Sequence, residues 1–264
     1  MKSIPHRILG HFASLLVCLG FVGTPAYASM IAPGEYDSPH AGEFVVTGGK
    51  WGPSPVLGTP GGEVTYSFMP SGTNCFIGGM PPPEPSPCTI SALSTFMPSG
   101  FEAQIEAAFD AWAAVANITF ELVDDDGVDF NAPPTSGHGD IRLGGHVFDG
   151  AGGILGHGYF PPPNGNTAAG DIHFDVAETW KIGFGGAGFD IFQVTAHEIG
   201  HAIGLFHTGV PGSLMNPSYT EAFSGPQADD IAGARAIYNP EPATVALLGF
   251  GLVCLFLTHR KLSA

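Results

Sequence analysis

One eleven-residue segment, residues 197–207, constrains this chain more than any other: it reads His-Glu-Ile-Gly-His-Ala-Ile-Gly-Leu-Phe-His. Residues four apart lie on one face of an α-helix, so a helix here would present the imidazoles of His197 and His201 side by side. Gly204 can leave right-handed helical geometry, which would turn the chain and return His207 as a third ligand. The spacing therefore predicts three histidines around one metal ion.

Three protein ligands leave the fourth position of a tetrahedral zinc ion open to water, which is the catalytic arrangement. Glu198 follows the first histidine and can reach such a water as a general base. The alternative is a helix whose histidines are satisfied without metal. The glycine and the third histidine at these spacings favour the zinc site.

The N-terminus is typical of a secretory signal peptide. Lys2 and Arg7 precede an apolar run over residues 8–22, and Ala26-Tyr27-Ala28 offers a cleavage site of small residues. We predict a signal peptide over residues 1–28, cut after Ala28. A short membrane anchor is the alternative.

The C-terminal segment, residues 240–264, has three parts. Pro-Glu-Pro at 240–242 precedes an uncharged stretch over 243–258 and the basic residues 259–261. This order resembles the PEP-CTERM sorting signal of Gram-negative bacteria. The resemblance implies recognition by exosortase-type machinery, transient inner-membrane insertion of the apolar helix, and a final place at the cell surface or outside it. A plain tail anchor is the alternative.

Charge and cysteine placement agree with export. The chain carries 8 Lys and Arg against 24 Asp and Glu, which argues against nucleic-acid binding because that requires a basic face. The acids serve either solubility or the binding of Ca²⁺. Cys75 and Cys88 are predicted to pair in an oxidising compartment, with two free thiols as the alternative.

Between the two ends, the pattern predicts an α+β domain with a small sheet and about three helices. Alternation indicates strands over 64–68, 118–123, 140–143 and 172–175. Helices are expected from Phe101, over 190–204 and from near Pro226, the first and last with capping boxes at Ser99–Glu102 and Ser224–Gln227. We interpret residues 29–50 as a loose leader and 144–170 as a glycine- and proline-rich loop.

The extended H-E-x-x-H-x-x-G-x-x-H motif resembles the signature of the metzincins, and residues 213–219 resemble the Met-turn of one metzincin family, the matrixins. The resemblance runs from about residue 50 to 239, so residues 51–239 would be a zincin-like catalytic domain with a small mixed, twisted sheet. It implies a secreted zinc metalloendopeptidase acting on proteins or peptides. Met215 would lie beneath the zinc, and Pro217 and Tyr219 would wall the S1′ pocket.

The same resemblance implies bound Ca²⁺, for which a glycine-rich loop with oxygen ligands is suited. Residues 148–157 and 173–180 match the family's metal loop and its partner strand. The implied carboxylate ligands are Asp149, Asp175 and Glu178, and the implied carbonyl ligands are Gly150, Gly152 and Ile154. Asp140 and Asp171 match a second calcium site. Solvated loop acids are the alternative for both sites.

His157 and His173 match ligands of the family's structural zinc, but the family's His-Gly-Asp is missing at its expected place and His146 stands there instead. A zinc on these three histidines has no identified fourth ligand, and an empty or altered site is the alternative. The propeptide motif Pro-Arg-Cys-Gly is also missing, so we predict no cysteine switch. A non-catalytic surface or matrix protein, or a tail-anchored maturation protease, would use the same fold.

Overall fold

The computed structural model describes residues 27–31, 43–76, 87–130, 137–162 and 168–238. Most of the predicted signal peptide and all of the predicted C-terminal helix lie outside these residues. Within them, no helix has the length and apolar composition needed to cross a membrane.

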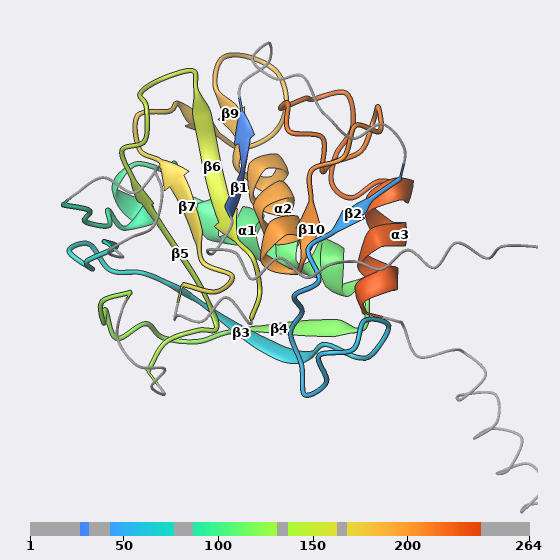
Figure 1. Ribbon diagram of the computed structural model, residues 1–264. Helices are drawn as coiled ribbons and strands as arrows, with labels where there is room; N and C mark the ends of the chain where they lie inside the picture. Colours follow the sequence, from blue (N-terminus) through green and yellow to red (C-terminus); the bar gives the residue numbers. More distant parts are fainter. Residues whose placement is uncertain (1–26, 32–42, 77–86, 131–136, 163–167, 239–264) are drawn as a thin grey trace, which may run out of the picture.

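A six-stranded mixed sheet in the order β1-β6-β7-β5-β3-β4 forms the frame (Figure 1). Strands β7, β5, β3 and β4 run parallel to one another, while β6 is antiparallel to β7 and β1 is antiparallel to β6. The strands of this sheet are β1 (Tyr27–Ile31), β3 (Gly62–Phe68), β4 (Ile118–Leu122), β5 (Ile141–His146), β6 (Ile154–Tyr159) and β7 (Ile172–Asp175). Two short pairs complete the strands: β2 (Val45–Val46) with β10 (Leu205–Phe206), and β8 (Trp180–Lys181) with β9 (Phe189–Asp190).

The described helices are α1 (Phe101–Ala113), α2 (Ile191–Ala202), α3 (Ala228–Ile237) and the 3-10 turn η1 (Leu93–Thr95). The large apolar residues of α1 are buried, and Trp112 among them is fully enclosed. The Trp112 indole donates to the carbonyl oxygen of Ala196 at 2.8 Å, which ties α1 to α2. This bond fixes the helix that carries the first two histidines against the main core.

The α+β class with three α-helices is confirmed, but both predicted capping boxes are wrong in detail. Helix α1 has Gly100 at its N-cap, with φ of +94°, and no side-chain cap. Because Gly100 takes the N-cap position, Ser99 lies one residue before it and does not cap the helix. Helix α3 begins at Ala228. Its capping box is formed by Gln227 and Asp230, not by Ser224 and Gln227.

The interpretation of residues 144–170 as a loop is also wrong, because β5 extends to His146 and β6 spans Ile154–Tyr159. The leader is likewise more structured than its composition indicates. Its residues Val45 and Val46 pair with β10, directly after the turn at Gly204. Cys75 and Cys88 form a disulfide, as predicted, and both cysteines are buried.

Candidate functional site

Helix α2 positions the first two histidines and the glutamate of the 197–207 segment. Asp190 caps the helix by accepting a hydrogen bond from the backbone N–H of Gln193 at 2.9 Å. His197, Glu198 and His201 are all completely buried. The helix therefore delivers two imidazoles and a carboxylate into a site shielded from bulk water.

The turn that follows α2 has the predicted conformation, since Gly204 has φ of +108°. It returns His207 to the helix, so that the three Nε2 atoms of His197, His201 and His207 lie 3.0–3.2 Å from one another. Tetrahedral ligands at the usual Zn–N distance of about 2.0–2.1 Å would be about 3.3 Å apart. The three nitrogens therefore fit a zinc ion without rearrangement.

Backbone carbonyls hold two of the imidazoles in the tautomer that a metal requires. Nδ1 of His197 donates to Leu214 O at 2.6 Å, and Nδ1 of His201 donates to Leu205 O at 2.9 Å. Each bond leaves the Nε2 lone pair facing the cluster. Burial lowers the pKa of His197 to about 4, and burial together with the neighbouring histidines lowers the pKa of His201 well below its ordinary value. Both rings are neutral near pH 7 and ready to act as ligands.

Two glycines of β6 allow the sheet to approach the Glu198 carboxylate. A Cβ added to Gly156 would lie 3.3 Å from Glu198 Oε1, and one added to Gly158 would lie 2.7 Å from the backbone oxygen of the same residue. No larger residue fits at Gly158 without displacing β6 or α2. The sequence pattern missed these glycines as site residues, because they lie in the segment interpreted as a loop.

The loop after His207 packs against α2. Met215 is buried, and its sulfur occupies the space that a side chain at Gly200 would need. The buried Asp230 of α3 holds this loop: it accepts hydrogen bonds from the Ser213 hydroxyl and from the backbone N–H groups of Leu214 at 2.7 Å and Met215 at 3.0 Å. The carbonyl that orients His197 belongs to the same loop.

The residues predicted to wall a substrate pocket lie just beyond this loop. Pro217 and Tyr219 are buried. The Tyr219 hydroxyl accepts a hydrogen bond from the backbone N–H of Asp190 at 2.9 Å and donates one to Glu221 at 2.8 Å. Glu221 also forms an ion pair with Lys181 at 2.6 Å. These contacts fix Tyr219 against the N-terminus of α2.

A second histidine cluster lies across three neighbouring strands. His146 ends β5, His157 lies in β6, and His173 pairs with it from β7. All three are buried, and one ring nitrogen from each lies within 4.8 Å of the other two. Nδ1 of His173 and Nε2 of His157 are 3.2 Å apart. The donor set suits zinc, which binds imidazole nitrogen readily.

The carboxylates predicted to bind calcium form hydrogen bonds within the glycine-rich loop, but they are not among the groups of described residues whose ligand atoms converge within 4.8 Å. Asp149 accepts hydrogen bonds from the N–H of Ile154 at 3.1 and 3.2 Å, and Glu178 accepts one from Gly152 at 2.6 Å. Burial raises the pKa of Glu178, and the negative charges of Asp175 and Asp149 raise it further. A cation among the three carboxylates would relieve this repulsion.

The two acids predicted for a second calcium ion have protein partners. Asp140 accepts hydrogen bonds from the N–H and hydroxyl of Thr65, both at 2.9 Å, and Asp171 accepts one from the N–H of Arg142 at 2.8 Å. Neither residue belongs to the two histidine clusters. A second calcium site therefore stays a prediction.

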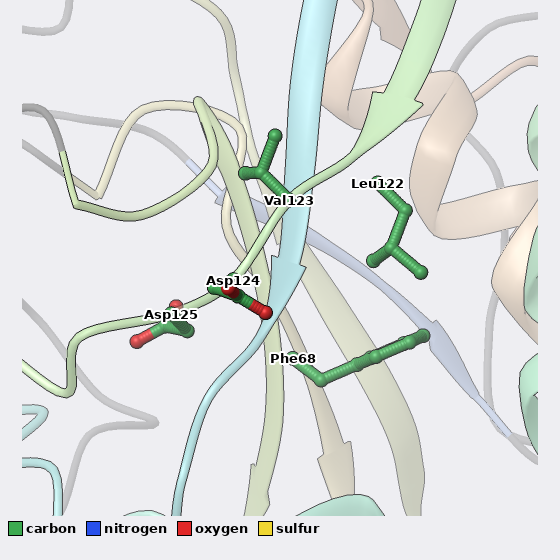
Figure 2. A pocket seen from close by; sticks show the side chains of 5 residues that line it. All are labelled: Phe68, Leu122, Val123, Asp124 and Asp125. Atoms are coloured by element: carbon green, nitrogen blue, oxygen red, sulfur yellow. The ribbon is translucent and has the colours of Figure 1, made fainter.

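A surface hollow lies at the opposite edge of the sheet, beside β3 and β4. It is lined by Phe68, Leu122, Val123, Asp124 and Asp125 (Figure 2). The Asp125 side chain is 1% exposed and forms a bidentate pair with Arg142 at 2.7 and 2.9 Å. Burial alone would raise the pKa of Asp125, but the hydrogen bonds from Arg142 and Ser67 lower it overall. The pair joins β5, which contains Arg142, to the segment that follows β4.

Comparison with protein families gives two matches that adjoin each other. Residues 88–239 match the matrixin family, and residues 240–261 match the PEP-CTERM protein-sorting motif. The first match covers α1, α2, α3 and both histidine clusters. The second begins at the Pro-Glu-Pro and confirms the resemblance of the C-terminal segment to a sorting signal.

Individual relatives agree with the first match. Matrix metalloproteinase-16 of Homo sapiens is 42% identical over 149 residues, which are 52% of this chain and 23% of the relative. Neutrophil collagenase of Homo sapiens is 38% identical over 156 residues, 56% of this chain and 31% of the relative. Karilysin of Tannerella forsythia is 40% identical over 140 residues, 52% of this chain and 28% of the relative.

The matched region spans less than a third of each relative's length, but it covers more than half of the 264 residues printed here. The family match includes the helix, the turn and the loop that build the buried histidine site. On the family match over residues 88–239, this chain belongs to the matrixin family.

Proposed function

We propose that this chain is a secreted zinc-dependent endopeptidase whose catalytic zinc is held by His197, His201 and His207. The observation that carries the proposal is the buried triangle of Nε2 atoms, 3.0–3.2 Å apart, with Glu198 beside it on α2. Family membership supports the same chemistry. Non-catalytic proteins that keep the fold have no need of this combination of ligands and carboxylate.

When bound, zinc would supply Lewis acidity, which polarises the scissile carbonyl and makes water acidic enough to deprotonate near pH 7. The Glu198 carboxylate would accept a proton from the attacking water and deliver it to the leaving amine nitrogen. Its complete burial keeps this proton away from bulk solvent. The carbonyls of Leu214 and Leu205 would keep His197 and His201 oriented through the cycle.

The substrates we propose are proteins or peptides bound in extended form along the edge of the sheet. Pro217 and Tyr219 would wall the pocket for the residue after the scissile bond, with an apolar side chain preferred there. The hydrogen bonds of the Tyr219 hydroxyl to Asp190 and Glu221 support a rigid wall. A rigid, mostly apolar wall selects by size and shape.

Two further ions would stabilise the fold. We assign a structural zinc to His146, His157 and His173, which are buried with converging nitrogens. We assign a Ca²⁺ to the loop around Asp149, Asp175 and Glu178, with carbonyl oxygens from Gly150, Gly152 and Ile154. Both sites join the β5–β7 region, so their ions would brace the strands beside the catalytic cluster.

The ends of the chain would direct its sorting. Residues 1–28 would act as a signal peptide, and the PEP-CTERM match at 240–261 supports handling by exosortase-type machinery. The C-terminal helix would insert transiently into the inner membrane before release to the cell surface or beyond. Mass spectrometry of the mature protein tests this: a C-terminus near Pro240–Pro242 supports release, and an intact tail supports an anchored maturation protease.

The peptidase proposal is tested by replacing Glu198 with alanine in the exported chain, with zinc and calcium supplied. Casein and a quenched-fluorescent peptide library report cleavage, and elemental analysis reports bound zinc. We expect cleavage to fall by at least about 10²-fold while zinc is retained, because general-base catalysis contributes about 10²–10⁴-fold. Glu102→Ala, an exposed glutamate on α1, is the matched control and should leave cleavage unchanged.

Wild-type protein that binds zinc but cleaves nothing would refute the proposal. That result would favour the non-catalytic reading, in which the chain is a metal-binding surface or matrix protein. Cleavage that persists in Glu198→Ala at the wild-type rate would also refute the assigned role of this carboxylate.

A further inference from the structure

Two aromatic side chains from distant parts of the chain hold the C-terminal end of α2. The Trp51 indole N–H donates to the carbonyl oxygen of Ala202 at 2.7 Å, and the Tyr238 hydroxyl donates to that of Ile203 at 2.9 Å. The same hydroxyl accepts a hydrogen bond from the backbone N–H of Trp51 at 3.0 Å. A helix leaves its last carbonyl groups without partners inside the helix. Trp51 and Tyr238 therefore form a connected pair on these groups, hereafter the aromatic clamp.

The aromatic clamp adjoins the turn that returns His207 to the histidine cluster. Gly204 lies in this turn, and its carbonyl oxygen accepts two hydrogen bonds from Thr47, from the backbone N–H at 2.9 Å and from the hydroxyl at 3.1 Å. A Cβ added to Gly204 would lie 2.6 Å from the backbone oxygen of Gly49, so this part of the predicted leader packs directly against the turn. Three consecutive carbonyl groups at and after the end of α2 are thus held from outside the helix.

The turn in its place sets the orientation of two of the three proposed zinc ligands. Leu205 follows Gly204, and its carbonyl oxygen accepts the hydrogen bond from Nδ1 of His201 at 2.9 Å. His207 comes two residues later, and its Nε2 lies 3.2 Å from the Nε2 atoms of both His197 and His201. A displaced turn would therefore move an orienting carbonyl group and a ligand together.

Burial and a cationic neighbour keep the aromatic clamp rigid. Tyr238 is fully buried, and burial raises the pKa of its hydroxyl, which stays protonated and able to donate. The buried ammonium group of Lys50 lies 5.2 Å from the centroid of the Tyr238 ring. It also donates to the backbone oxygens of Trp51 at 2.6 Å, Ser54 at 3.0 Å and Pro60 at 3.2 Å. A buried polar network whose members are paired in this way holds its side chains in one arrangement.

We propose that Trp51 and Tyr238 are positioning residues for the catalytic zinc. They act through the turn at Gly204, which sets where His201 and His207 place their Nε2 atoms. The inference rests on the proposed peptidase function, because it concerns the zinc ligands of that same site. Loss of an outer partner of a metal ligand changes metal affinity or activity by about 10–100-fold. The clamp acts one step further out, through the backbone, so we expect the lower end of this range.

The test removes each donor of the clamp separately in the exported chain. Tyr238→Phe keeps the ring but loses the hydroxyl that donates to Ile203, and Trp51→Phe keeps an aromatic ring but loses the indole N–H. Tyr66→Phe is the matched control, because Tyr66 is a buried tyrosine of β3 whose ring stacks on Phe109 of α1 at a centroid distance of 4.1 Å. Thermal unfolding of all proteins records the loss of stability.

Cadmium-113 NMR of the cadmium-loaded protein reports the metal geometry of each histidine cluster separately, since each bound ion gives its own signal. The signal that disappears in His207→Ala is assigned to the cluster of His197, His201 and His207. We expect both clamp variants to shift this signal and to bind cadmium there about tenfold more weakly in competition with a chelator. Any signal from the second cluster should stay in place. A purely structural role would lower the unfolding temperature without moving either signal.

The kinetic readout separates zinc positioning from substrate binding. The proposed pocket wall at Tyr219 is fixed to the N-terminus of α2, the end opposite the clamp. In the zinc-loaded clamp variants, kcat for a quenched peptide should therefore fall about tenfold while KM stays within about twofold of wild type. The Tyr66→Phe protein should match wild type in kcat, KM and the cadmium signal.

Failure of this inference is distinguishable from failure of the peptidase. If wild type and both clamp variants share one cadmium signal, one affinity and one kcat, the peptidase stands and the positioning role is overturned. A Tyr66→Phe protein with the same shift as the clamp variants would also overturn it. If wild type binds cadmium in the cluster but its zinc form cleaves nothing, the peptidase fails, and the cadmium shift still decides the role of the clamp. A wild-type cluster that binds no cadmium would overturn both.

Discussion

Replacing Asp230 with asparagine should loosen the loop that orients His197. The buried carboxylate accepts hydrogen bonds from the Ser213 hydroxyl and from three backbone N–H groups, those of Leu214, Met215 and Gln227, the last at 2.8 Å. Asparagine offers one acceptor oxygen and turns an N–H₂ group toward the remaining donors. Two buried donors then lose their partner, at about 1–3 kcal/mol each, which gives a total of about 2–6 kcal/mol.

This loss should be visible both in stability and in metal affinity. A domain of this size changes its Tm by about 2–4 °C per kcal/mol, so we expect the Tm to fall by about 4–24 °C. Because Leu214 O holds Nδ1 of His197, a displaced loop should also weaken zinc binding about tenfold, as measured by competition with a chromophoric chelator.

The neighbouring Asp229 provides the matched control. It accepts hydrogen bonds from the N–H of Phe44 at 3.0 Å and from the hydroxyl of Thr208, and the oxygen of asparagine can accept them as well. Asp229→Asn should therefore cost less than about 1 kcal/mol. Equal losses in the two variants, or an Asp230→Asn protein within about 0.5 kcal/mol of wild type, would refute the assignment of Asp230 as the brace of this loop.

Three further predictions concern the site and its frame. Gly158→Ala should cost about 1–3 kcal/mol and reduce kcat/KM, because its Cβ would lie 2.7 Å from the Glu198 backbone oxygen; unchanged thermal unfolding would contradict this. The metal-free protein should lose about 2 kcal/mol between pH 7.5 and 5, since the unfolded chain protonates His197 near pH 6.5 and the fold only near 4. Urea unfolding in chelator measures this loss, and equal or greater stability at pH 5 would contradict it. Replacing Cys75 and Cys88 by alanine should remove about 3 kcal/mol of loop-closure stabilisation, with thermal unfolding as the readout.

The cluster of His197, His201 and His207 was predictable because its geometry is local. Helical spacing places His197 and His201 on one face, and glycine at 204 permits the positive φ that returns His207. The amphipathic stripe of α1 was readable for the same reason, since burial of one helix face leaves a period in the sequence. Each of these inferences needs only residues within about three helical turns of one another.

The caps and the second cluster depend on contacts that no local pattern records. Serine and threonine near a helix start are common, so the sequence around Ser99 indicated a cap that the conformation of Gly100 prevents. His146, His157 and His173 come together only through the register of three strands. Family resemblance supplied that grouping; spacing alone could not.

Strand β6 shows why the least predictable element can lie closest to the chemistry. Glycine disfavours strands, so a segment with Gly156 and Gly158 reads as loop. The same lack of side chains lets the backbone of β6 approach Glu198 closely, as the 3.3 and 2.7 Å distances to an added Cβ show. Whatever pairs with this edge, whether a substrate or the chain's own β1, is thereby brought beside the carboxylate. The two glycines that make β6 hard to predict from the sequence are therefore the ones that allow its backbone to lie beside Glu198.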